Sequence, residues 1–336
     1  MEVIHLYDKL SGIGGAESIC VSIFEGFNNK KQIKNNFLCS FTKYNNIAQD
    51  YKNNISKENY IRFSPIYLLL NYSNAVYISH HRKITSLLII FSKIFFKKLK
   101  VIHVAHNEFN NLKHLTFFPE TIVAVSNRVK LNHKNYFGLN KVKVIYNGIK
   151  DIGENRLRIN KKDTLDILLP GRITKIKQQV EIVRQLKGKL NQNIRILFAG
   201  DGPMYNLLIE EISTDKNFTA LGHVDKMDNL YSQVDFVLLF SQKEGLPLSL
   251  IEATSYGIPC ICNDVGGNTE VVINGINGRV INTFDELAVE INKLVNIEQH
   301  QYESMCRESR KIFEKHFSYD KMIDDYFDLV NECYGR

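Results

Sequence analysis

The sequence contains no tryptophan, only six prolines in 336 residues, and no long uninterrupted hydrophobic segment. Few prolines and only 19 glycines exclude collagen-like and low-complexity chains. The most apolar stretch, residues 85–96, is interrupted by Lys93, whereas a membrane-spanning helix needs about 20 apolar residues. The first residues lack the basic and apolar regions of a signal peptide, and they predict a buried strand instead.

Cysteine is also sparse and scattered. The six cysteines include one Cys-x-Cys pair and no Cys-x-x-Cys pair; they are Cys20, Cys39, Cys260, Cys262, Cys306 and Cys333. This spacing indicates neither a zinc ribbon nor a disulfide framework. We therefore expect a reduced, cytoplasmic chain.

The net charge of +7 conceals two halves of opposite sign. Residues 1–150 include 21 basic and 8 acidic residues, a net charge of +13, whereas residues 151–336 include 22 basic and 28 acidic residues, a net charge of −6. Such an asymmetry suggests two domains with different partners. The basic half is expected to be drawn to phosphate, nucleic acid or an anionic membrane surface.

Short apolar runs alternate with helical patterns along the chain. The expected strands are residues 3–7, 36–41, 75–79, 101–105, 121–125 and 142–145 in the first half, and 166–170, 194–199, 218–221, 236–240, 259–263 and 278–281 in the second. The expected helices are 16–27, 84–98, 178–190, 203–212, 248–256, 284–296 and 318–333. Buried runs between helices predict two parallel-sheet α/β domains, and the polar segment 150–164 is the expected linker.

A glycine cluster, Gly12-Ile13-Gly14-Gly15, follows the first expected strand and opens a helix. Backbone N–H groups at such a turn suit a phosphate. The dinucleotide fingerprint fails because Glu17 stands where it needs glycine, and no P-loop sequence follows. A phosphate site and a tight turn without a ligand therefore both remain open.

Charged residues and glycines follow several strands of the second half. Arg172 and Lys177 come after the strand at 166–170, at the strand end where open α/β sheets bind ligands. An arginine fork and a lysine charge in one short loop suit a diphosphate, although a solvated basic loop is the alternative. Gly200-Asp201-Gly202-Pro203 and Gly266-Gly267 follow two further strands, so several loops present similar chemistry to one edge.

Two glutamates flank the start of the helix expected at residues 248–256. Glu244 lies in the preceding loop, and the amides of Leu248 and Ser249 would face an anion at the helix N-terminus. Glu252 lies one turn into the helix. Its carboxylate could accept both hydroxyls of a ribose; the alternative is an exposed helix acid.

Together these motifs give the sequence a specific resemblance. In order, they are Gly14-Gly15-Ala16-Glu17, Ala124-Val125-Ser126-Asn127, Tyr146-Asn147-Gly148-Ile149, Gly171-Arg172 with Lys177, Gly200-Asp201-Gly202-Pro203, Glu244-Gly245-Leu246-Pro247 with Glu252-Ala253, Gly266-Gly267 with Glu270, and Phe317-Ser318. The chain resembles glycosyltransferase family 4, the retaining nucleotide-sugar enzymes of GT-B fold, and within it the bacterial surface-polysaccharide type. Many relatives have glycine where this chain has Gln178.

The resemblance implies two Rossmann-like domains facing across a cleft. Residues 1–152 would form the N-terminal acceptor-binding domain, residues 153–317 the C-terminal nucleotide-sugar-binding domain, and residues 318–336 a helix that crosses back to the N-terminal domain. The implied reaction moves a hexose or N-acetylhexosamine, with retention, from a nucleotide-diphosphate sugar to a lipid-linked or oligosaccharide acceptor in O-antigen or capsule synthesis. UDP is preferred over GDP by analogy with the family.

The resemblance also assigns roles to residues. Arg172 and Lys177 would hold the donor diphosphate, and Glu252 would hold the ribose. Glu244 would contact hydroxyls of the transferred sugar, and His106 would lie near the reacting sugar, a loop or buried histidine being the alternative. The remaining donor-binding residues would be Gly14, Gly15, Gly202, Leu248 and Ser249. The chain has no Asp-x-Asp sequence, so we expect no metal and no cofactor, with cationic side chains stabilising the leaving diphosphate.

The acceptor side is inferred from the basic half. Basic residues surround an apolar helical segment: Arg82, Lys83, Lys93, Lys97, Lys98 and Lys100 lie around Leu87, Leu88, Ile90, Phe91, Ile94 and Phe95. This pattern favours a helix on an anionic membrane surface, hence a peripheral protein on the inner face of the cell membrane with a polyprenyl-diphosphate-linked saccharide as acceptor. An ordinary core-facing helix is the alternative.

Three other functions remain open. A nucleotide-sugar 2-epimerase has the same two-domain architecture, and a non-catalytic sugar-nucleotide-binding scaffold would keep the fold without the reaction. The pairing of Arg172 and Lys177 with two glutamates favours the transferase over both. A nucleic-acid-binding protein is prompted by the basic half, but the sequence has no helix-turn-helix, zinc-finger or aromatic RNA-binding motif.

Overall fold

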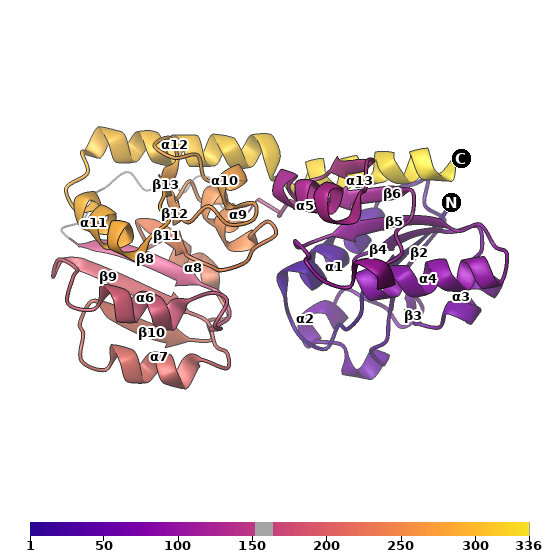
Figure 1. The fold of residues 1–336 in the computed structure, drawn as a ribbon, viewed down its shortest axis with the longest axis horizontal. Coiled ribbons are helices and arrows are strands. Elements are labelled where there is room, and N and C mark those ends of the chain that lie inside the picture. Colours follow the sequence, from indigo (N-terminus) through magenta and orange to yellow (C-terminus); the bar gives the residue numbers. More distant parts are fainter. Residues whose placement is uncertain (152–163, 336) are drawn as a thin grey trace. The chain divides into compact units, whose positions relative to one another are not determined.

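A computed structural model describes residues 1–151 and 164–335. The chain divides into two compact units: unit 1 comprises Met1–Gly148 with Tyr319–Arg336, and unit 2 comprises Ile149–Ser318 (Figure 1). The sequence placed these boundaries at 152 and 317. Most of the expected linker, residues 150–164, lies outside the described residues.

Unit 1 is built on a seven-stranded sheet in the order β3-β2-β1-β4-β5-β6-β7. Its strands are β1 (Glu2–Leu6), β2 (Asn35–Ser40), β3 (Tyr60–Arg62), β4 (Val76–Ser79), β5 (Lys100–Ala105), β6 (Thr121–Ala124) and β7 (Val142–Val144). All neighbouring strands pair in parallel. Parallel pairing requires helical crossovers that cover the sheet, which explains why β4 is buried along its whole length.

The helices of unit 1 connect these strands. They are α1 (Gly15–Phe27), α2 (Gln49–Lys52), α3 (Pro65–Asn71), α4 (Arg82–Ile94), α5 (Asn127–Phe137) and α13 (Tyr319–Tyr334), with 3₁₀ turns at Tyr44–Asn46 and Lys113–Leu115. Helix α13 packs on α1, where Phe27 meets Phe327 edge-on at 6.0 Å and Tyr319 donates a hydrogen bond to the carbonyl of Ser22. Residues from the end of the chain therefore complete unit 1.

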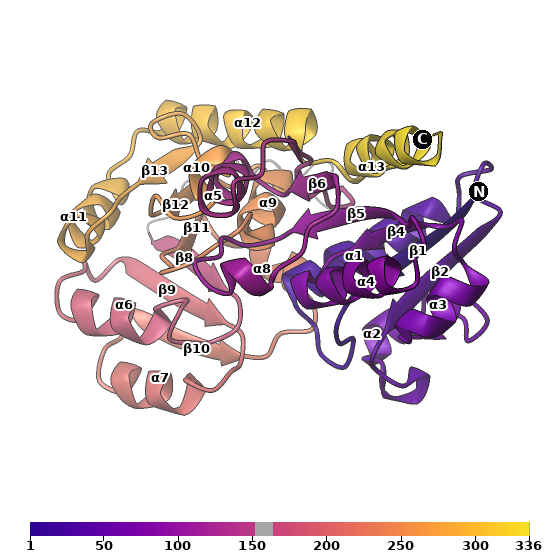
Figure 2. The ribbon, with the colours of Figure 1, turned by 45° about the vertical axis from the view of Figure 1, so that its right-hand side comes forward.

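Unit 2 contains a six-stranded parallel sheet in the order β10-β9-β8-β11-β12-β13. The strands are β8 (Leu165–Pro170), β9 (Ile194–Ala199), β10 (Phe218–Gly222), β11 (Phe236–Leu239), β12 (Cys260–Cys262) and β13 (Gly278–Val280). The helices are α6 (Gln179–Leu186), α7 (Tyr205–Ile212), α8 (Met227–Tyr231), α9 (Leu248–Ser255), α10 (Asn268–Val271), α11 (Phe284–Leu294) and α12 (Gln299–His316). Figure 2 shows α6 and α7 beside β9 and β10.

The expected fold class is confirmed, because both units are parallel sheets flanked by helices. The sequence did not predict strand β3 or helices α2, α3, α5, α8, α10 and α12, and it extended α4 to residue 98. The helix ends at Ile94 because Phe96 adopts φ +52°, a left-handed conformation that cannot continue an α-helix. Among the described residues, no helix is both long enough and apolar enough to cross a membrane.

Candidate functional site

Two loops pack closely at the strand ends of unit 2. The loop after β8 and the loop after β9 are joined by hydrogen bonds from Gly171 N to Ala199 O (2.9 Å) and from Ile173 N to Asp201 O (2.9 Å). A side chain at Gly202, which has φ +158°, would place its Cβ 2.4 Å from the carbonyl oxygen of Ile173. Gly202, assigned to the donor from sequence, thus has a packing role: it lets the second loop support the loop that carries Arg172.

Lys177 and Glu244 form an ion pair at this edge. The Lys177 ammonium lies 2.7 Å from Oε1 of Glu244, and the Glu244 side chain is only 9% exposed. The backbone holds the two loops together, since Gln242 N donates to Ile176 O at 2.8 Å. Two residues that the sequence predicted for one site, 67 positions apart, are therefore brought into direct contact.

The loop carrying Glu244 is supported from behind by a glycine. Gly266 has φ +56°, and a Cβ there would lie 2.2 Å from the carbonyl oxygen of Glu244. Gly267 N also donates to the carbonyl of Gly245 at 2.8 Å. This close approach fixes the loop and leaves no room for a side chain at position 266.

Arg172 is exposed on the same edge. Its carbonyl accepts a hydrogen bond from the Gln179 side chain at 3.0 Å. Within the described residues, no hydrogen bond or ion pair engages its guanidinium, so the group can bind a ligand. The nearby Gln178 adopts φ +56°, the conformation that glycine favours. The loop therefore adopts at this position a backbone conformation that favours glycine.

Helix α9 carries the second glutamate. Pro247 precedes the helix and no side chain caps it, so the first amides, at Leu248 and Ser249, have no intrahelical acceptor. Glu252 accepts a hydrogen bond from the Tyr231 hydroxyl at 2.7 Å. Burial raises the pKa of Glu252, whereas the hydrogen bond from Tyr231 lowers it. Glu252 is thus a largely buried, oriented acceptor rather than an exposed helix acid.

The sequence missed Tyr231, the residue that bonds to Glu252. Tyr231, at the end of α8, stacks on Tyr256 with ring centroids 5.2 Å apart, and the Tyr256 hydroxyl donates to Asp228 at 2.9 Å. All three lie outside the motifs, and no local pattern marks them. Tyr231 meets Glu252 only because α8 and α9 lie close in space.

The remaining predicted residues belong to unit 1. Gly14 is the N-cap of α1, and its N–H lies 3.4 Å from the Tyr51 hydroxyl, which also bonds to Ser18 at 2.9 Å. Tyr51 was not predicted. Gly15 begins the helix. The glycine turn therefore opens a helix, as expected, with a tyrosine packed against its backbone.

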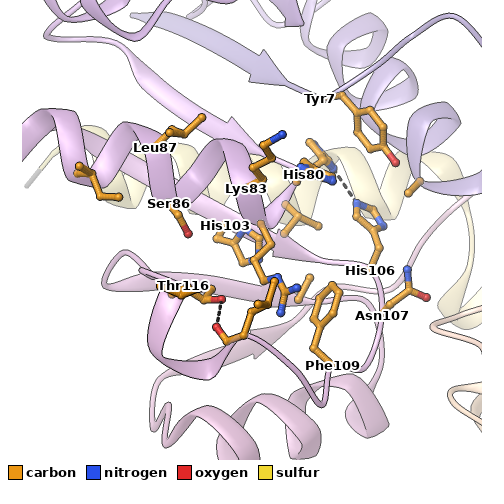
Figure 3. A pocket seen from close by; sticks show the side chains of 18 residues that line it. Tyr7, His80, Lys83, Ser86, Leu87, His103, His106, Asn107, Phe109 and Thr116 are labelled. Carbon is orange, nitrogen blue, oxygen red and sulfur yellow. Dashed lines mark hydrogen bonds between the residues drawn. The ribbon is translucent and has the colours of Figure 1, made fainter. Parts of the chain in front are cut away.

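A cavity of about 600 Å³ lies in unit 1 at the carboxyl ends of β4 and β5 (Figure 3). His106, which follows β5, lines this cavity. His80, at the end of the neighbouring strand β4, also lines it, as do His81 and His103. The ring nitrogens His80 Nδ1 and His106 Nε2 are 2.9 Å apart. Burial lowers the pKa of His106 to about 4 and lowers that of His80 well below its usual range, so both rings are neutral near pH 7.

The wall of this cavity combines cations with apolar side chains. Arg82 stacks over Phe109 at 4.1 Å and donates two hydrogen bonds to Asn111. Leu87 and Ile90 line the cavity from α4. Ile84 and Leu88, by contrast, belong to the core of unit 1. The first turns of α4 are therefore core-facing, which is the alternative that the sequence left open.

The end of the segment formed by α4 and the residues after it is exposed, unlike the first turns of the helix. Ile94, Phe95 and Phe96 are 61%, 46% and 95% exposed, and Lys97 and Lys98 beside them are also exposed. Two other cations predicted for this surface are engaged: Lys93 lies over Phe117, and Lys100 donates to the carbonyl of Tyr334. The short stretch from Ile94 to Lys98, here called the aromatic–basic tip, keeps the expected character.

In residues 1–151 and 164–335, no three His, Cys, Asp or Glu side chains come together as ligands for a metal ion. The polar groups of the unit 2 edge are instead one arginine, one lysine, helix amides and two carboxylates. This set is suited to a polyhydroxylated anion, because it combines anion-binding groups with hydroxyl acceptors.

Comparisons with known proteins agree with this chemistry. Residues 151–312 match the family model described as Glycosyl transferases group 1. The chain is 28% identical over 213 residues to the O-antigen biosynthesis glycosyltransferase WbnH of Escherichia coli, covering 63% of the chain and 61% of WbnH. It is also 28% identical over 214 residues to the UDP-Gal:alpha-D-GlcNAc-diphosphoundecaprenol alpha-1,3-galactosyltransferase of Escherichia coli, covering 56% of the chain and 55% of that enzyme.

The structural match covers more of the chain than the sequence matches do. The crystal structure of Anabaena Alr3699/HepE in complex with UDP and glucose superposes with a TM-score of 0.80 at 16% identity, covering 99% of this chain and 100% of that one. The sequence matches span less than two thirds of either Escherichia coli relative. Residues 151–312 are therefore similar to the glycosyl transferases group 1 family, and the chain has the fold of the GT-B glycosyltransferases.

Proposed function

We propose that the protein is a retaining glycosyltransferase of bacterial surface-polysaccharide synthesis. It would transfer a hexose or N-acetylhexosamine from a nucleotide-diphosphate sugar, preferably a UDP-sugar, to a lipid-linked or oligosaccharide acceptor. The observation that carries the proposal is the Lys177–Glu244 pair, 2.7 Å apart, on the edge that also presents Arg172 and α9.

The donor would be held by the groups of this edge. Arg172 and Lys177 would bind the diphosphate, and the first amides of α9 would face its charge. Glu252 has one oxygen bonded to Tyr231, which leaves the other to accept a ribose hydroxyl. Glu244 would give up part of its contact with Lys177 and accept hydrogen bonds from hydroxyls of the transferred sugar instead.

The proposed mechanism is inferred from the groups on which charge develops during the reaction. As the glycosidic bond breaks, negative charge builds on the leaving diphosphate, and preoriented cations and amides stabilise it. The acceptor proton would pass to the departing phosphate oxygen, so no dedicated base is required. His106 would contact the reacting sugar. The cationic side chains supply the charge that a metal ion supplies in other transferases, and no cofactor is needed.

The preference for a uridine nucleotide rests on similar proteins whose names or structures include UDP. One relative is named for a UDP-Gal donor and a diphosphoundecaprenol acceptor, and the HepE structure contains UDP. A lipid-linked acceptor also fits the unit 1 cavity, whose apolar side chains lie beside Arg82 and Lys83. The aromatic–basic tip would bind an anionic membrane, placing the protein on the cytoplasmic face as a peripheral protein.

A donor screen tests the proposed reaction. UDP-hexoses, UDP-N-acetylhexosamines and GDP-mannose are incubated with the full chain, and nucleotide release and sugar products are followed by NMR. We expect UDP release from one UDP-sugar, faster with a diphosphate-linked saccharide acceptor, and a product with the donor's anomeric configuration. Conversion of the donor sugar to its 2-epimer without an acceptor would support the epimerase instead, and no turnover of any donor would support the scaffold.

A further inference from the structure

Two histidines from neighbouring strand ends meet in the unit 1 cavity. Strands β4 and β5 are paired in parallel, with Ser79 opposite His103, so the loops that follow them are adjacent. His80 and His106 stack with ring centroids 5.2 Å apart, and Nδ1 of His80 lies 2.9 Å from Nε2 of His106 (Figure 3). One of these nitrogens must donate a proton to the other, since both rings are neutral.

The second nitrogen of His80 identifies the donor. Nε2 of His80 is buried with no hydrogen-bond partner. If His106 donated, the proton of His80 would sit on Nε2 and form a buried N–H without an acceptor. If His80 donates from Nδ1, Nε2 carries only a lone pair. Buried N–H groups without acceptors are rarer and costlier than unused acceptors, so His80 donates.

In two other histidines of unit 1, the hydrogen-bonded nitrogen also carries the proton and the unpartnered nitrogen is bare. His133 Nδ1 lies 3.0 Å from the carbonyl of Val129, and His5 Nε2 lies 3.0 Å from Oδ1 of Asn36. Both partners are acceptors, since the Asn36 amide nitrogen donates to the carbonyl of Phe24. Each ring therefore donates from its bonded nitrogen, and each leaves a bare nitrogen buried and unpartnered, at Nε2 of His133 and Nδ1 of His5.

We propose that His80 is a positioning residue that sets the tautomer of His106. By donating from Nδ1 to Nε2 of His106, it keeps the His106 proton on Nδ1 and makes that N–H a hydrogen-bond donor for a sugar oxygen bound in the cavity. This inference rests on the proposed function, in which His106 contacts the reacting sugar. His106 is then a donor with its other nitrogen occupied, and not a general base.

The environment of the pair keeps both rings neutral. Burial is the main cause that lowers both pKa values, and the neighbouring histidines His81, His5 and His103 add unfavourable charge interactions. A neutral ring has one proton to place, and the hydrogen bond made by one nitrogen decides which nitrogen carries it. The His80 contact therefore decides the chemistry that His106 presents.

Nitrogen-15 NMR of the full chain labelled at histidine tests the tautomer directly. The His106 signals are assigned with His106→Gln, and His133 and His5 serve as internal references for protonation at Nδ1 and at Nε2. We expect a protonated Nδ1 and a bare Nε2 for His106. A protonated Nε2 in the wild-type protein would overturn the proposal, and this measurement does not depend on transferase activity.

Matched variants test the consequence. In His80→Asp the carboxylate can only accept, so the His106 proton should move to Nε2; in His80→Asn the amide can still donate. Because one hydrogen bond to the sugar is lost, we expect kcat to fall about tenfold more in His80→Asp than in His80→Asn, with similar unfolding temperatures. His300→Asp, at an exposed histidine of unit 2, is the control with unchanged activity.

The outcomes separate this proposal from the proposed function. An inverted His106 tautomer in His80→Asp with the same kcat as His80→Asn would show that the tautomer has no role, and would overturn the positioning. If His80→Asp does not fold, His80→Leu replaces it: kcat must fall below that of His80→Asn, and an equal kcat would again overturn the positioning. Absence of transfer by the wild-type protein with every donor would contradict the proposed function alone.

Discussion

The Lys177 ammonium lies 2.7 Å from the carboxylate of Glu244, although 67 residues separate them in the sequence. The Lys177 side chain is 26% exposed and that of Glu244 only 9%, so the carboxylate depends on the lysine for its charge balance. A ligand diphosphate would compete with Glu244 for the same ammonium. Under the proposed function, the pair would therefore link the stability of this edge to donor binding.

Removing the lysine should destabilise the protein. Lys177→Met leaves the Glu244 carboxylate buried and unpaired, and we expect a loss of about 1–3 kcal/mol in the free energy of unfolding. The double variant Lys177→Met with Glu244→Gln removes both charges and should recover most of that loss. Lys175→Met, at an exposed lysine of the same loop, is the matched control. Urea denaturation measures all three, and an equal loss in the single and double variants would show that the pair is not coupled.

Gln178 offers a test of backbone strain. Its φ of +56° costs a non-glycine residue about 1–2 kcal/mol, whereas glycine adopts it freely at an entropic cost of about 0.5–1 kcal/mol. Gln178→Gly should therefore raise stability by about 0.5–1 kcal/mol, seen as a higher thermal midpoint. Gln178→Ala keeps the strain and should give no gain. A lower midpoint for the glycine variant would mean that the Gln178 side chain stabilises the loop.

Tyr231 controls the charge of Glu252. Its hydroxyl lowers the pKa of Glu252 against the raising effect of burial, so Tyr231→Phe should raise that pKa further. The folded-state pKa of Glu252 is already above its unfolded value of 4.5. The contribution of Glu252 therefore lowers the free energy of unfolding as pH rises from 4.5 through the folded-state pKa. In Tyr231→Phe this decrease should extend to higher pH.

Nucleotide binding should follow the same shift. If a ribose hydroxyl donates to ionised Glu252, as proposed, UDP affinity should fall as pH decreases, and the fall should begin at higher pH in Tyr231→Phe. Calorimetric titration with UDP between about pH 5 and pH 8 measures this. Tyr256→Phe is the comparison, because its hydroxyl bonds to Asp228 instead. Identical pH profiles for Tyr231→Phe and the wild-type protein would contradict the role of Tyr231.

The aromatic–basic tip should bind anionic membranes. Phe95→Ser with Phe96→Ser removes exposed apolar area, and we expect flotation with anionic liposomes to fall strongly at low salt, where attraction is strongest. Ile276→Ser, at an exposed apolar side chain of unit 2 that is 46% exposed, should float like the wild-type protein. No flotation of the wild-type protein at low salt would rule out the membrane assignment.

The sequence predicted the strands best where burial is complete. β4 and β11 are buried at every position, so their apolar runs are unambiguous. β3 is a three-residue edge strand, Tyr60–Arg62, too short to show a pattern. α12 was missed although Tyr302, Met305, Cys306, Ser309 and Phe313 recur at helical spacing on its buried face; its many charges concealed the signal.

The sequence predicted which residues gather at the unit 2 edge, but not the side chains that contact them. Glycines and charges after strands identified Arg172, Lys177, Glu244 and Glu252, because parallel strands bring their carboxyl ends to one edge. Tyr231 could not be identified, because its contact with Glu252 depends on how α8 packs. The His80–His106 contact needed the pairing of β4 with β5, which the sequence does not specify.

The most direct test of the central claim is calorimetric titration of UDP and GDP into the wild-type protein, Arg172→Ala, Lys177→Met and the Lys175→Met control. If Arg172 and Lys177 hold the diphosphate of a nucleotide-sugar, the wild-type protein and Lys175→Met bind UDP equally. Each of the other two variants should then bind at least about tenfold more weakly, because a charged hydrogen bond is lost. Equal affinity in all four proteins, or no binding of either nucleotide by the wild-type protein, would contradict the claim.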